Sequence, residues 1–360
     1  MKVVLISAAS CIHTTRWANG LVTKGLDVHL ISAHDLSHDL DYRVKYHPLK
    51  IKSPWGYVFG AFEVRQLLKK IQPVLVNAHY ATGYGFLARL VGFKPILFSV
   101  WGSDVYDFPE KSFLHRWLLK GNLKSADAIA STSHCMAQKT AETFQHKNVF
   151  ITPFGIDEKL FFFSQKPDEL QDKIVLGTVK TLKDVYGVDV LIKAFGQAWK
   201  KLGKPSNIVL EISGEGPDLE ALHKLGYSLG ISEQITFHGQ VEHANVPRML
   251  NRLDIYCAFS RAESFGVAIL EASACEKPVI VSDADGPAEV TLNGKTGLVV
   301  PKEDVEASAN AIIKLIQDEK LRNKMGKAGR AHVLEHYTWG KSLNLMLDAY
   351  SKILALKVKG

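Results

Sequence analysis

The chain has 360 residues, of which 46% are hydrophobic and 22% charged, and 44 lysine and arginine residues outweigh 37 acidic ones to give a formal net charge of +7. This composition excludes a disordered or collagen-like chain, and the length favours two domains. The absence of an apolar run of about 18 residues excludes a membrane-spanning helix. The basic balance favours anionic partners, but because it is not gathered in one tail it does not indicate a nucleic-acid-binding arm.

The cysteines are few and scattered, at positions 11, 135, 257 and 275. No CxxC pair and no Cys/His metal spacing occurs, so the sequence predicts neither a disulfide framework nor a zinc site. This usage fits a reducing cytoplasm. The apolar run Val3–Ile6 is too short for a secretion signal, so a cytoplasmic protein without a bound metal is expected.

Short apolar, β-branched runs alternate with helix-length segments through residue 155. A first helix is expected over residues 14–25, ending at Gly25. The expected strands are residues 2–7, 26–32, 73–79, 95–101, 127–133 and 148–155. Continuous apolar strands separated by helices predict a parallel sheet covered on both faces.

The pattern breaks at residues 156–173, which have no clean period and are expected to be a linker. A second alternating series then begins. Its strands are expected at residues 173–180, 207–216, 234–239, 254–260, 277–283 and 296–301, and its final helices at 303–317, 319–336 and 339–356. The sequence therefore predicts two tandem doubly wound, Rossmann-like α/β domains with a central cleft, over residues 1–155 and 156–338, and a C-terminal helix over 339–360. Open α/β sheets bind ligands at the carboxyl ends of their strands.

Small residues follow several of these strands, as in "TVKTLKDVYG" and "SGEGPDLEAL". Such loops let backbone N–H groups and a helix N-terminus approach a phosphate, although a single glycine there can simply make the turn. Lys180 and Lys183 lie in the first of these loops and could neutralise a diphosphate, with a solvated loop as the alternative. Glu263 and Glu271 bracket an apolar turn, where a carboxylate is rarely buried without a partner.

The segment "ESFGVAILEASACEKPVIVSD", followed by "GPAEVTLNGKTGLVVP", resembles the signature of the retaining GT-B glycosyltransferases of family four, the group 1 glycosyltransferases. Seven residues separate Glu263 from Glu271, as in that signature. "SGEGPDLEALHKLG", "ITFHGQV" and "LDIYCAFSRAESFG" follow the family order. The resemblance covers the second domain almost completely and continues more loosely through "NAHYATGYGFLARL", "SVWGSDVY" and "FGID" in the first.

The resemblance implies a hexosyltransferase that moves a sugar from a nucleoside-diphosphate sugar with retention at the anomeric carbon. Glu263 would contact the donor sugar and Glu271 the ribose hydroxyls. The remaining residues that it assigns to the donor are Phe265, Gly266, Val267, Gly214 and Val241, and the catalytic group would comprise Glu263, Lys180, Lys183 and Asp104. It also implies a helix over 339–360 that crosses back to the first domain, and its residues Leu343, Leu347, Tyr350 and Leu354 repeat at helical spacing.

The chain departs from the family pattern at two places. The family usually has Arg and Lys six residues apart where this chain has Lys180 and Tyr186, so Lys183 is expected to supply the second charge. Many members carry a histidine where this chain has Trp101. His13, His79 and Trp101 are therefore candidates on the acceptor side, with a structural role for each histidine as the alternative.

Because no nucleophile stands out, the resemblance implies a front-face mechanism without an active-site metal or cofactor, in which the enzyme stabilises the departing diphosphate. A UDP-sugar is favoured as donor and GDP-mannose is the alternative. The expected acceptor is a glycan or a polyprenyl-linked glycan, in surface polysaccharide assembly. The competing hypotheses are a catalytically weak nucleotide-sugar-binding subunit and, less well matched because it lacks the spaced glutamates, a sugar-nucleotide 2-epimerase.

Two segments of the first domain, residues 53–70 and 113–124, are rich in both aromatic and basic residues. Helices of this kind can lie on an anionic bilayer, which would place the protein on the inner face of the membrane and bring a lipid-linked acceptor past Trp55, Tyr57, Arg116 and Trp117. The alternative is a core face with lysine side chains that extend to solvent.

Overall fold

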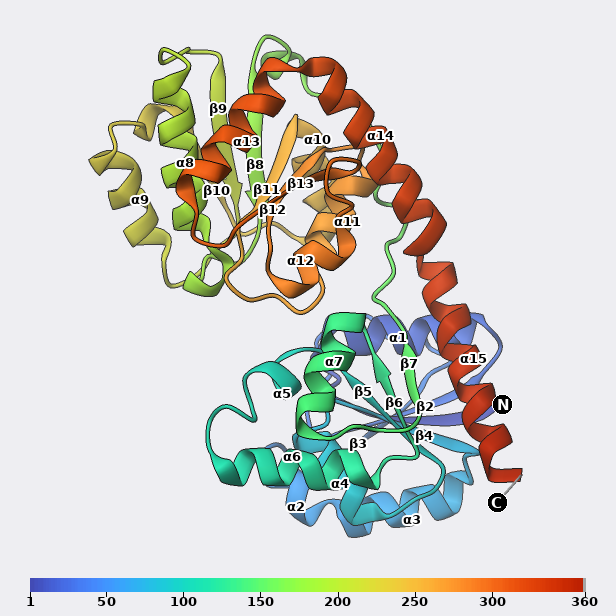
Figure 1. The fold of residues 1–360 in the computed structure, drawn as a ribbon. Helices are drawn as coiled ribbons and strands as arrows, with labels where there is room; N and C mark the ends of the chain where they lie inside the picture. Colours follow the sequence, from blue (N-terminus) through green and yellow to red (C-terminus); the bar gives the residue numbers. More distant parts are fainter. Residues whose placement is uncertain (359–360) are drawn as a thin grey trace. The chain divides into compact units, whose positions relative to one another are not determined.

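The computed structural model describes residues 1–358 and divides into two compact units. One unit comprises Met1–Pro153 together with the chain from Gly340 onward, and the other comprises Phe154–Trp339. Each unit is built around its own parallel sheet with helices on both faces (Figure 1). Among the described residues, no helix is both long and apolar enough to cross a membrane.

The N-terminal unit contains a seven-stranded sheet in the order β3-β2-β1-β4-β5-β6-β7, with every adjacent pair parallel. The strands are β1 (Lys2–Ile6), β2 (Asp27–Ser32), β3 (Lys45–Pro48), β4 (Leu75–His79), β5 (Ile96–Val100), β6 (Ala128–Ser131) and β7 (Val149–Ile151). All residues of β4, β5 and β6 are buried, which explains their continuous apolar runs. β3 was not expected, because its sequence KYHP lies at the half-exposed sheet edge.

Two helical layers cover this sheet. The helices are α1 (Ile12–Thr23), α2 (Gly56–Phe59), α3 (Ala61–Ile71), α4 (Gly83–Val91), α5 (Ser103–Tyr106), α6 (Phe113–Ser125), α7 (His134–Thr143) and α15 (Trp339–Val358). α3, α4, α6 and α7 pack on one face through a core that includes Val64, Leu87 and Leu123.

α15 lies on the opposite face, where the buried Asn77 Nδ2 of β4 donates a hydrogen bond to the Tyr350 hydroxyl at 3.0 Å. Leu343 and Tyr350 are buried as expected from their spacing, while Leu347 and Leu354 are half-buried. The helix thus packs on the sheet of residues 1–153, far from it in sequence.

The C-terminal unit contains a six-stranded sheet in the order β10-β9-β8-β11-β12-β13. The strands are β8 (Ile174–Val179), β9 (Ile208–Ser213), β10 (Ile235–Gly239), β11 (Ile255–Ala258), β12 (Val279–Ser282) and β13 (Gly297–Val300). The helices are α8 (Val188–Lys201), α9 (Leu219–Ser228), α10 (Val246–Arg252), α11 (Val267–Ala274), α12 (Asp285–Val290), α13 (Val305–Gln317) and α14 (Glu319–His336). The expectation of two doubly wound, Rossmann-like domains is confirmed.

The strand order decides which loops of this unit meet. β8 lies between β9 and β11, so the chain leaves the middle of the sheet in one direction through β9 and β10 and returns through β11. Because all these strands are parallel, the loops that follow them emerge at one edge. This change of direction at β8 is the place where open α/β sheets form ligand sites.

Candidate active site

A hollow of about 530 Å³ opens at the carboxyl ends of β8, β9 and β10. Backbone hydrogen bonds join the three loops that line it: Leu182 N–H donates to the Glu215 carbonyl at 2.9 Å, and Gly214 N–H donates to the Gly239 carbonyl at 2.7 Å. Its lining residues are Val179, Lys180, Thr181, Ser213, Gly214, Glu215, Gly216, Gln240 and Val241. Gly214 and Val241, two of the predicted donor-binding residues, therefore lie in the same hollow as Lys180.

Glycine is required at position 214 for two physical reasons. Its φ of +141° is one that side-chain-bearing residues rarely adopt, and a Cβ there would collide with the Lys180 carbonyl oxygen. The β9 loop can thus lie directly against the β8 loop. This close approach leaves a backbone-lined hollow of the kind that accepts phosphates.

The side chains of Lys180 and Glu263 form an ion pair beside this hollow. Lys180 Nζ lies 2.5 Å from Glu263 Oε1, and the Ser260 hydroxyl donates to Glu263 Oε2 at 2.7 Å. The ammonium also lies over the ring of Tyr186, 4.5 Å from its centroid. Only 14% of the Lys180 side chain and 11% of the Glu263 side chain are exposed, so little water screens the pair.

Glu271 lies on α11, one helix turn beyond the loop that carries Glu263. Its carboxylate is nearly buried, with 9% of the side chain exposed, and His243 Nε2 lies 3.4 Å from Oε1. Both carboxylates lie near the buried phenol of Tyr256 on β11. Burial is the main cause that raises the pKa of this phenol, and the charges of Glu263 and Glu271 raise it further. The spaced glutamates thus share one buried region, each with its own cationic or histidine partner.

The loop before α11 is held in place by its neighbours. Gly266, with a φ of +99°, precedes the first helical residue, Val267, and lets the chain turn into the helix. Phe265 is buried and packs edge-on against Phe154 and Tyr337, with ring centroids 6.1 Å apart in both pairs. The three residues predicted to face the donor therefore lead into α11, whose first residue is Val267, and backbone N–H groups at a helix N-terminus favour an anion.

An arginine–carboxylate pair braces the same loop against α8. Arg261 Nη1 and Nη2 lie 2.9 and 3.0 Å from the two carboxylate oxygens of Asp189. Burial of Asp189 opposes its ionisation, but hydrogen bonds from Arg261 and Lys193 outweigh burial and lower its pKa to about 2. The bidentate geometry fixes the loop between Ser260 and Gly266 relative to α8.

Lys183 does not join the Lys180 group. Its side chain is exposed and lines a different hollow, together with Asp184 and Asp189 of the α8 side. In this structure Lys183 therefore lies apart from Lys180, and its role as the second charge stays a prediction. The reason is local: Leu182 is buried between the two lysines, which turns them to different sides of the loop.

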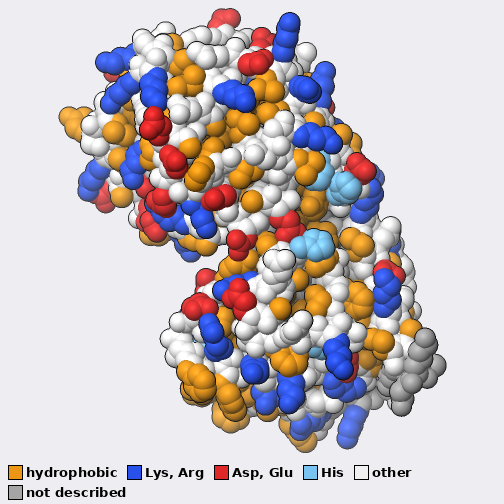
Figure 2. Space-filling model, in the orientation of Figure 1, with side chains coloured by type: hydrophobic (Ala, Val, Ile, Leu, Met, Phe, Trp, Pro, Cys, Tyr) orange, Lys and Arg blue, Asp and Glu red, His pale blue; other side chains and the backbone are white. Residues whose placement is uncertain are grey.

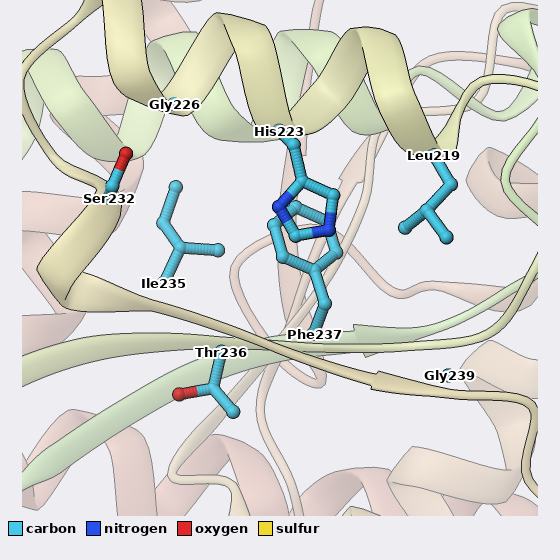
Figure 3. A pocket seen from close by; sticks show the side chains of 8 residues that line it. All are labelled: Leu219, His223, Gly226, Ser232, Ile235, Thr236, Phe237 and Gly239. Atoms are coloured by element: carbon cyan, nitrogen blue, oxygen red, sulfur yellow. The ribbon is translucent and has the colours of Figure 1, made fainter.

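A further hollow of about 490 Å³ lies between α9 and the edge strand β10 (Figure 3). His223 of α9 lies over Phe237 of β10, with 4.0 Å between the ring centroids. The other labelled side chains are small or aliphatic, apart from Ser232 and Thr236. No predicted site residue lines this hollow, and we assign no ligand to it.

The three acceptor-side candidates of the N-terminal unit form one aromatic cluster around Trp101. The ring centroid of His79 lies 4.3 Å from that of Trp101, and the ring centroid of His13 lies 6.0 Å from it. His79 is fully buried, bonds Ser7 Oγ through Nδ1 at 3.0 Å, and its pKa falls to about 3 because burial disfavours the cation. His79 is therefore a neutral histidine at physiological pH, which favours the structural alternative.

Asp104 is also buried, with 1% of its surface exposed. Its carboxylate accepts hydrogen bonds from the backbone N–H groups of Ala81, Trp101 and Gly102 at 2.9 to 3.1 Å. These contacts tie the loop after β4 to the loop after β5. Asp104 therefore holds these two loops together in this structure, and its catalytic role stays a prediction.

Two residues beside the glutamates escaped sequence reasoning. Ser260 could have been found, since it follows β11 and stands three residues before Glu263. His243 could not, because its partner Glu271 is 28 residues away in the chain. Within residues 1–358, no group of three or more His, Cys, Asp or Glu side chains is placed to hold a metal ion.

Comparison with known proteins shows the family of the chain. A family model described as glycosyl transferases group 1 matches residues 161–332, and one described as glycosyl transferase 4-like matches residues 2–133. The chain belongs to the group 1 glycosyltransferases. The matched region of the C-terminal unit includes the hollow, both glutamates and Lys180.

Curated group 1 relatives include two enzymes of different specificity. The chain is 26% identical to the N-acetyl-alpha-D-glucosaminyl L-malate synthase of Bacillus anthracis, over 78% of this chain and 75% of that protein. It is 29% identical to the GDP-mannose-dependent alpha-(1-6)-phosphatidylinositol monomannoside mannosyltransferase of Mycolicibacterium smegmatis, over 83% of this chain and 81% of that one.

Among solved structures, HepE of Anabaena in complex with UDP superposes with a TM-score of 0.83 at 17% identity, covering 98% of this chain and 100% of that one. At this identity the likeness concerns the fold. Together with the two parallel sheets, it assigns this glycosyltransferase the GT-B fold.

Proposed function

We propose that this group 1 glycosyltransferase transfers a hexose from a nucleoside-diphosphate sugar to a glycan or lipid-linked glycan, with retention at the anomeric carbon. The observation that carries the proposal is the Lys180–Glu263 ion pair beside a backbone-lined hollow at the carboxyl ends of β8, β9 and β10. A cation and an array of peptide groups suit a diphosphate, while the carboxylates suit hydroxyl-bearing groups.

Each part of the donor has a matching group in the C-terminal unit. The diphosphate is assigned to Lys180 and to the N-terminal turn of α11, at Gly266 and Val267. The ribose hydroxyls are assigned to Glu271, whose nearly buried carboxylate is a strong acceptor pair. The base is assigned to the part of the hollow formed by Gln240 and Val241.

Glu263 is assigned to the transferred sugar rather than to covalent catalysis. Both of its oxygens accept hydrogen bonds, one from Lys180 and one from Ser260, so the carboxylate is fixed in place as an acceptor. Retention then follows from a front-face displacement in which the departing diphosphate takes the acceptor's proton. Lys180 would contribute by stabilising the negative charge that develops on the leaving group.

A UDP-sugar is the donor we favour, and GDP-mannose is the alternative. UDP is bound by the structural neighbour HepE, and GDP-mannose is the donor named for the mycobacterial relative. The acceptor we favour is a polyprenyl-linked or other lipid-linked glycan in surface polysaccharide assembly, because the mycobacterial relative's acceptor is a phosphatidylinositol monomannoside. The enzyme would then work at the inner face of the membrane.

Donor turnover by the purified chain tests the proposal. Release of nucleoside diphosphate from a panel of UDP- and GDP-sugars would be followed with and without lipid-linked glycan, and proton NMR would report the anomeric configuration of the first product. We expect one donor to turn over. We also expect the anomeric bond to be axial in the product when it is axial in the donor. Binding without transfer or hydrolysis of any donor would instead favour a catalytically weak binding subunit, and an inverted product would overturn retention.

A further inference from the structure

One layer of helices in the N-terminal unit exposes large aromatic side chains to solvent. α2, α3 and α6 each contact α4, and these four helices cover the same face of the sheet. The exposed fractions are 65% for Trp55, 61% for Phe59, 69% for Phe62, 84% for Phe113 and 57% for Trp117. Soluble surfaces rarely gather exposed aromatic side chains in this way.

These side chains form two stripes of helical period. On α6, the exposed positions Phe113, Arg116, Trp117, Lys120 and Lys124 repeat every three or four residues, while Leu119 and Leu123 on the other side are fully buried. Trp55, Phe59 and Phe62 form the second stripe, and the rings of Trp55 and Phe59 stack at 6.2 Å. Both stripes thus face away from the sheet.

Basic side chains accompany both stripes. Residues 50–70 contain five lysine or arginine residues and one glutamate. Residues 110–124 contain four lysine or arginine residues and one glutamate. Figure 2 shows hydrophobic and basic side chains side by side over the region of α2, α3 and α6. Arg116 is paired with Glu110 at 2.9 Å, so Lys120 and Lys124 are the clearer charge carriers on α6.

Tyr57, expected on this surface, is not part of it. Its ring packs edge-on against the Tyr84 ring, with 5.0 Å between the ring centroids. A Cβ at position 83 would collide with the Tyr57 ring. Burial accordingly raises the pKa of its phenol. Tyr57 instead joins α2 to α4, which helps to hold the first stripe in place.

We infer that Trp55, Phe59, Phe62, Phe113, Trp117 and Lys120 form a surface that docks this unit on an anionic lipid bilayer. Aromatic rings favour the boundary between head groups and acyl chains, and adjacent lysines are attracted to anionic head groups. Charge complementarity selects this occupant over a second copy of the chain, whose same surface would carry the same positive charge. The inference rests on the proposed function for its purpose, which is access to a lipid-linked acceptor.

Vesicle flotation with the full-length chain tests the inference without donor or acceptor. Vesicles of phosphatidylcholine alone would be compared with vesicles containing about one third phosphatidylglycerol, at ionic strengths of about 0.1 M and about 0.5 M. We expect binding to the anionic vesicles that falls at high salt. Phe113→Ser with Trp117→Gln, Phe59→Ser with Phe62→Ser, and Lys120→Glu should each lower the partition coefficient at least about fivefold.

Two matched variants in the C-terminal unit serve as controls. Tyr227→Ser removes an aromatic ring that is 82% exposed on α9, and Lys320→Glu reverses an exposed charge on α14. Both should bind vesicles like the parent. A thermal shift with nucleoside diphosphate on the same samples reports whether the donor site is intact, which separates failure of this inference from failure of the proposed function.

Three outcomes would overturn the inference. They are absence of vesicle binding at low salt, binding that the stripe variants leave unchanged, and equal binding to neutral and anionic vesicles at both salt concentrations. Self-association of the parent that the Trp117→Gln change abolishes, without vesicle binding, would assign the surface to contact between copies of the chain.

Discussion

Lys180 and Glu263 are 83 residues apart in the sequence, yet their side chains form a nearly buried ion pair with 2.5 Å between Nζ and Oε1. The pair joins the loop after β8 to the loop after β11, two neighbouring strands of the sheet. It therefore places one cation and one ionised carboxylate beside the hollow before any ligand arrives. A preorganised charge of this kind costs no reorganisation when negative charge develops on a departing diphosphate.

Lys180→Ala should lower kcat/KM by about 30-fold to 1,000-fold, because the loss of one charge-assisted contact to a developing anion is worth about 2–4 kcal/mol. Lys183→Ala is the matched control. It removes the same side chain from the same loop, but from a position that lines a different hollow. Steady-state kinetics on the two variants measure the difference, and an equal loss in both would place the diphosphate elsewhere.

Tyr186 occupies the position where the family usually has a second cation, and its ring lies under the Lys180 ammonium. We expect Tyr186→Phe to keep near-parent kcat because the ring is retained. Tyr186→Leu should lower kcat about 2-fold to 30-fold, in line with a cation–π contact of about 0.5–2 kcal/mol. If Phe and Leu behave alike, the ring does not position Lys180. If Tyr186→Phe lowers kcat more than Tyr186→Leu is expected to, the tyrosine hydroxyl contacts the donor directly.

Glu271→Gln should weaken binding of the nucleoside diphosphate by about 10-fold to 100-fold, since hydrogen bonds to a charged acceptor contribute about 1.5–3 kcal/mol. Glu263→Gln should instead lower kcat more than the affinity for the nucleoside diphosphate, because its assigned partner is the sugar. Isothermal titration with the diphosphate and turnover of the intact donor separate the two effects. If the parent and Glu271→Gln bind the nucleoside diphosphate with the same affinity, Glu271 does not bind the ribose.

The Asp189–Arg261 pair predicts a pH-dependent contribution to stability. The Asp189 pKa is lowered from 3.8 to about 2, so the folded state favours the ionised form. The contribution is therefore fully present above pH 3.8 and is lost as the pH falls toward about 2. Arg261→Met should lower the free energy of unfolding at pH 7 by about 1–3 kcal/mol, and urea titrations should show this gap narrowing below pH 4. A gap that stays constant between pH 7 and pH 3 would contradict this account.

Much of the fold could be predicted because its signals are local. The last helices, expected at 303–317 and 319–336, form as α13 over 305–317 and α14 over 319–336. Asp304 and Asp318 cap them, each through a side-chain oxygen that accepts from a backbone N–H three residues on. β3 escaped prediction because an edge strand of four half-polar residues carries no apolar period.

The site was less predictable because its contacts join distant loops. The spacing of Glu263 and Glu271 placed both carboxylates in one region, as the structure does. The direction of the Lys183 side chain depends on the burial of Leu182, and the bonds of Asp104 depend on a loop 23 residues away. His243 reaches Glu271 across 28 residues. No periodic pattern in the sequence indicates any of these contacts.

The central claim is that the hollow between the loops of β8, β9 and β10 is the donor site, and a crystal structure of the chain with bound nucleoside diphosphate tests it most directly. The account predicts the diphosphate at Lys180 and the N-terminal turn of α11, the ribose hydroxyls on Glu271, and the base against Gln240 and Val241. A nucleotide bound between α9 and β10, or one that leaves the Lys180–Glu263 pair and Glu271 without contact, would contradict the account.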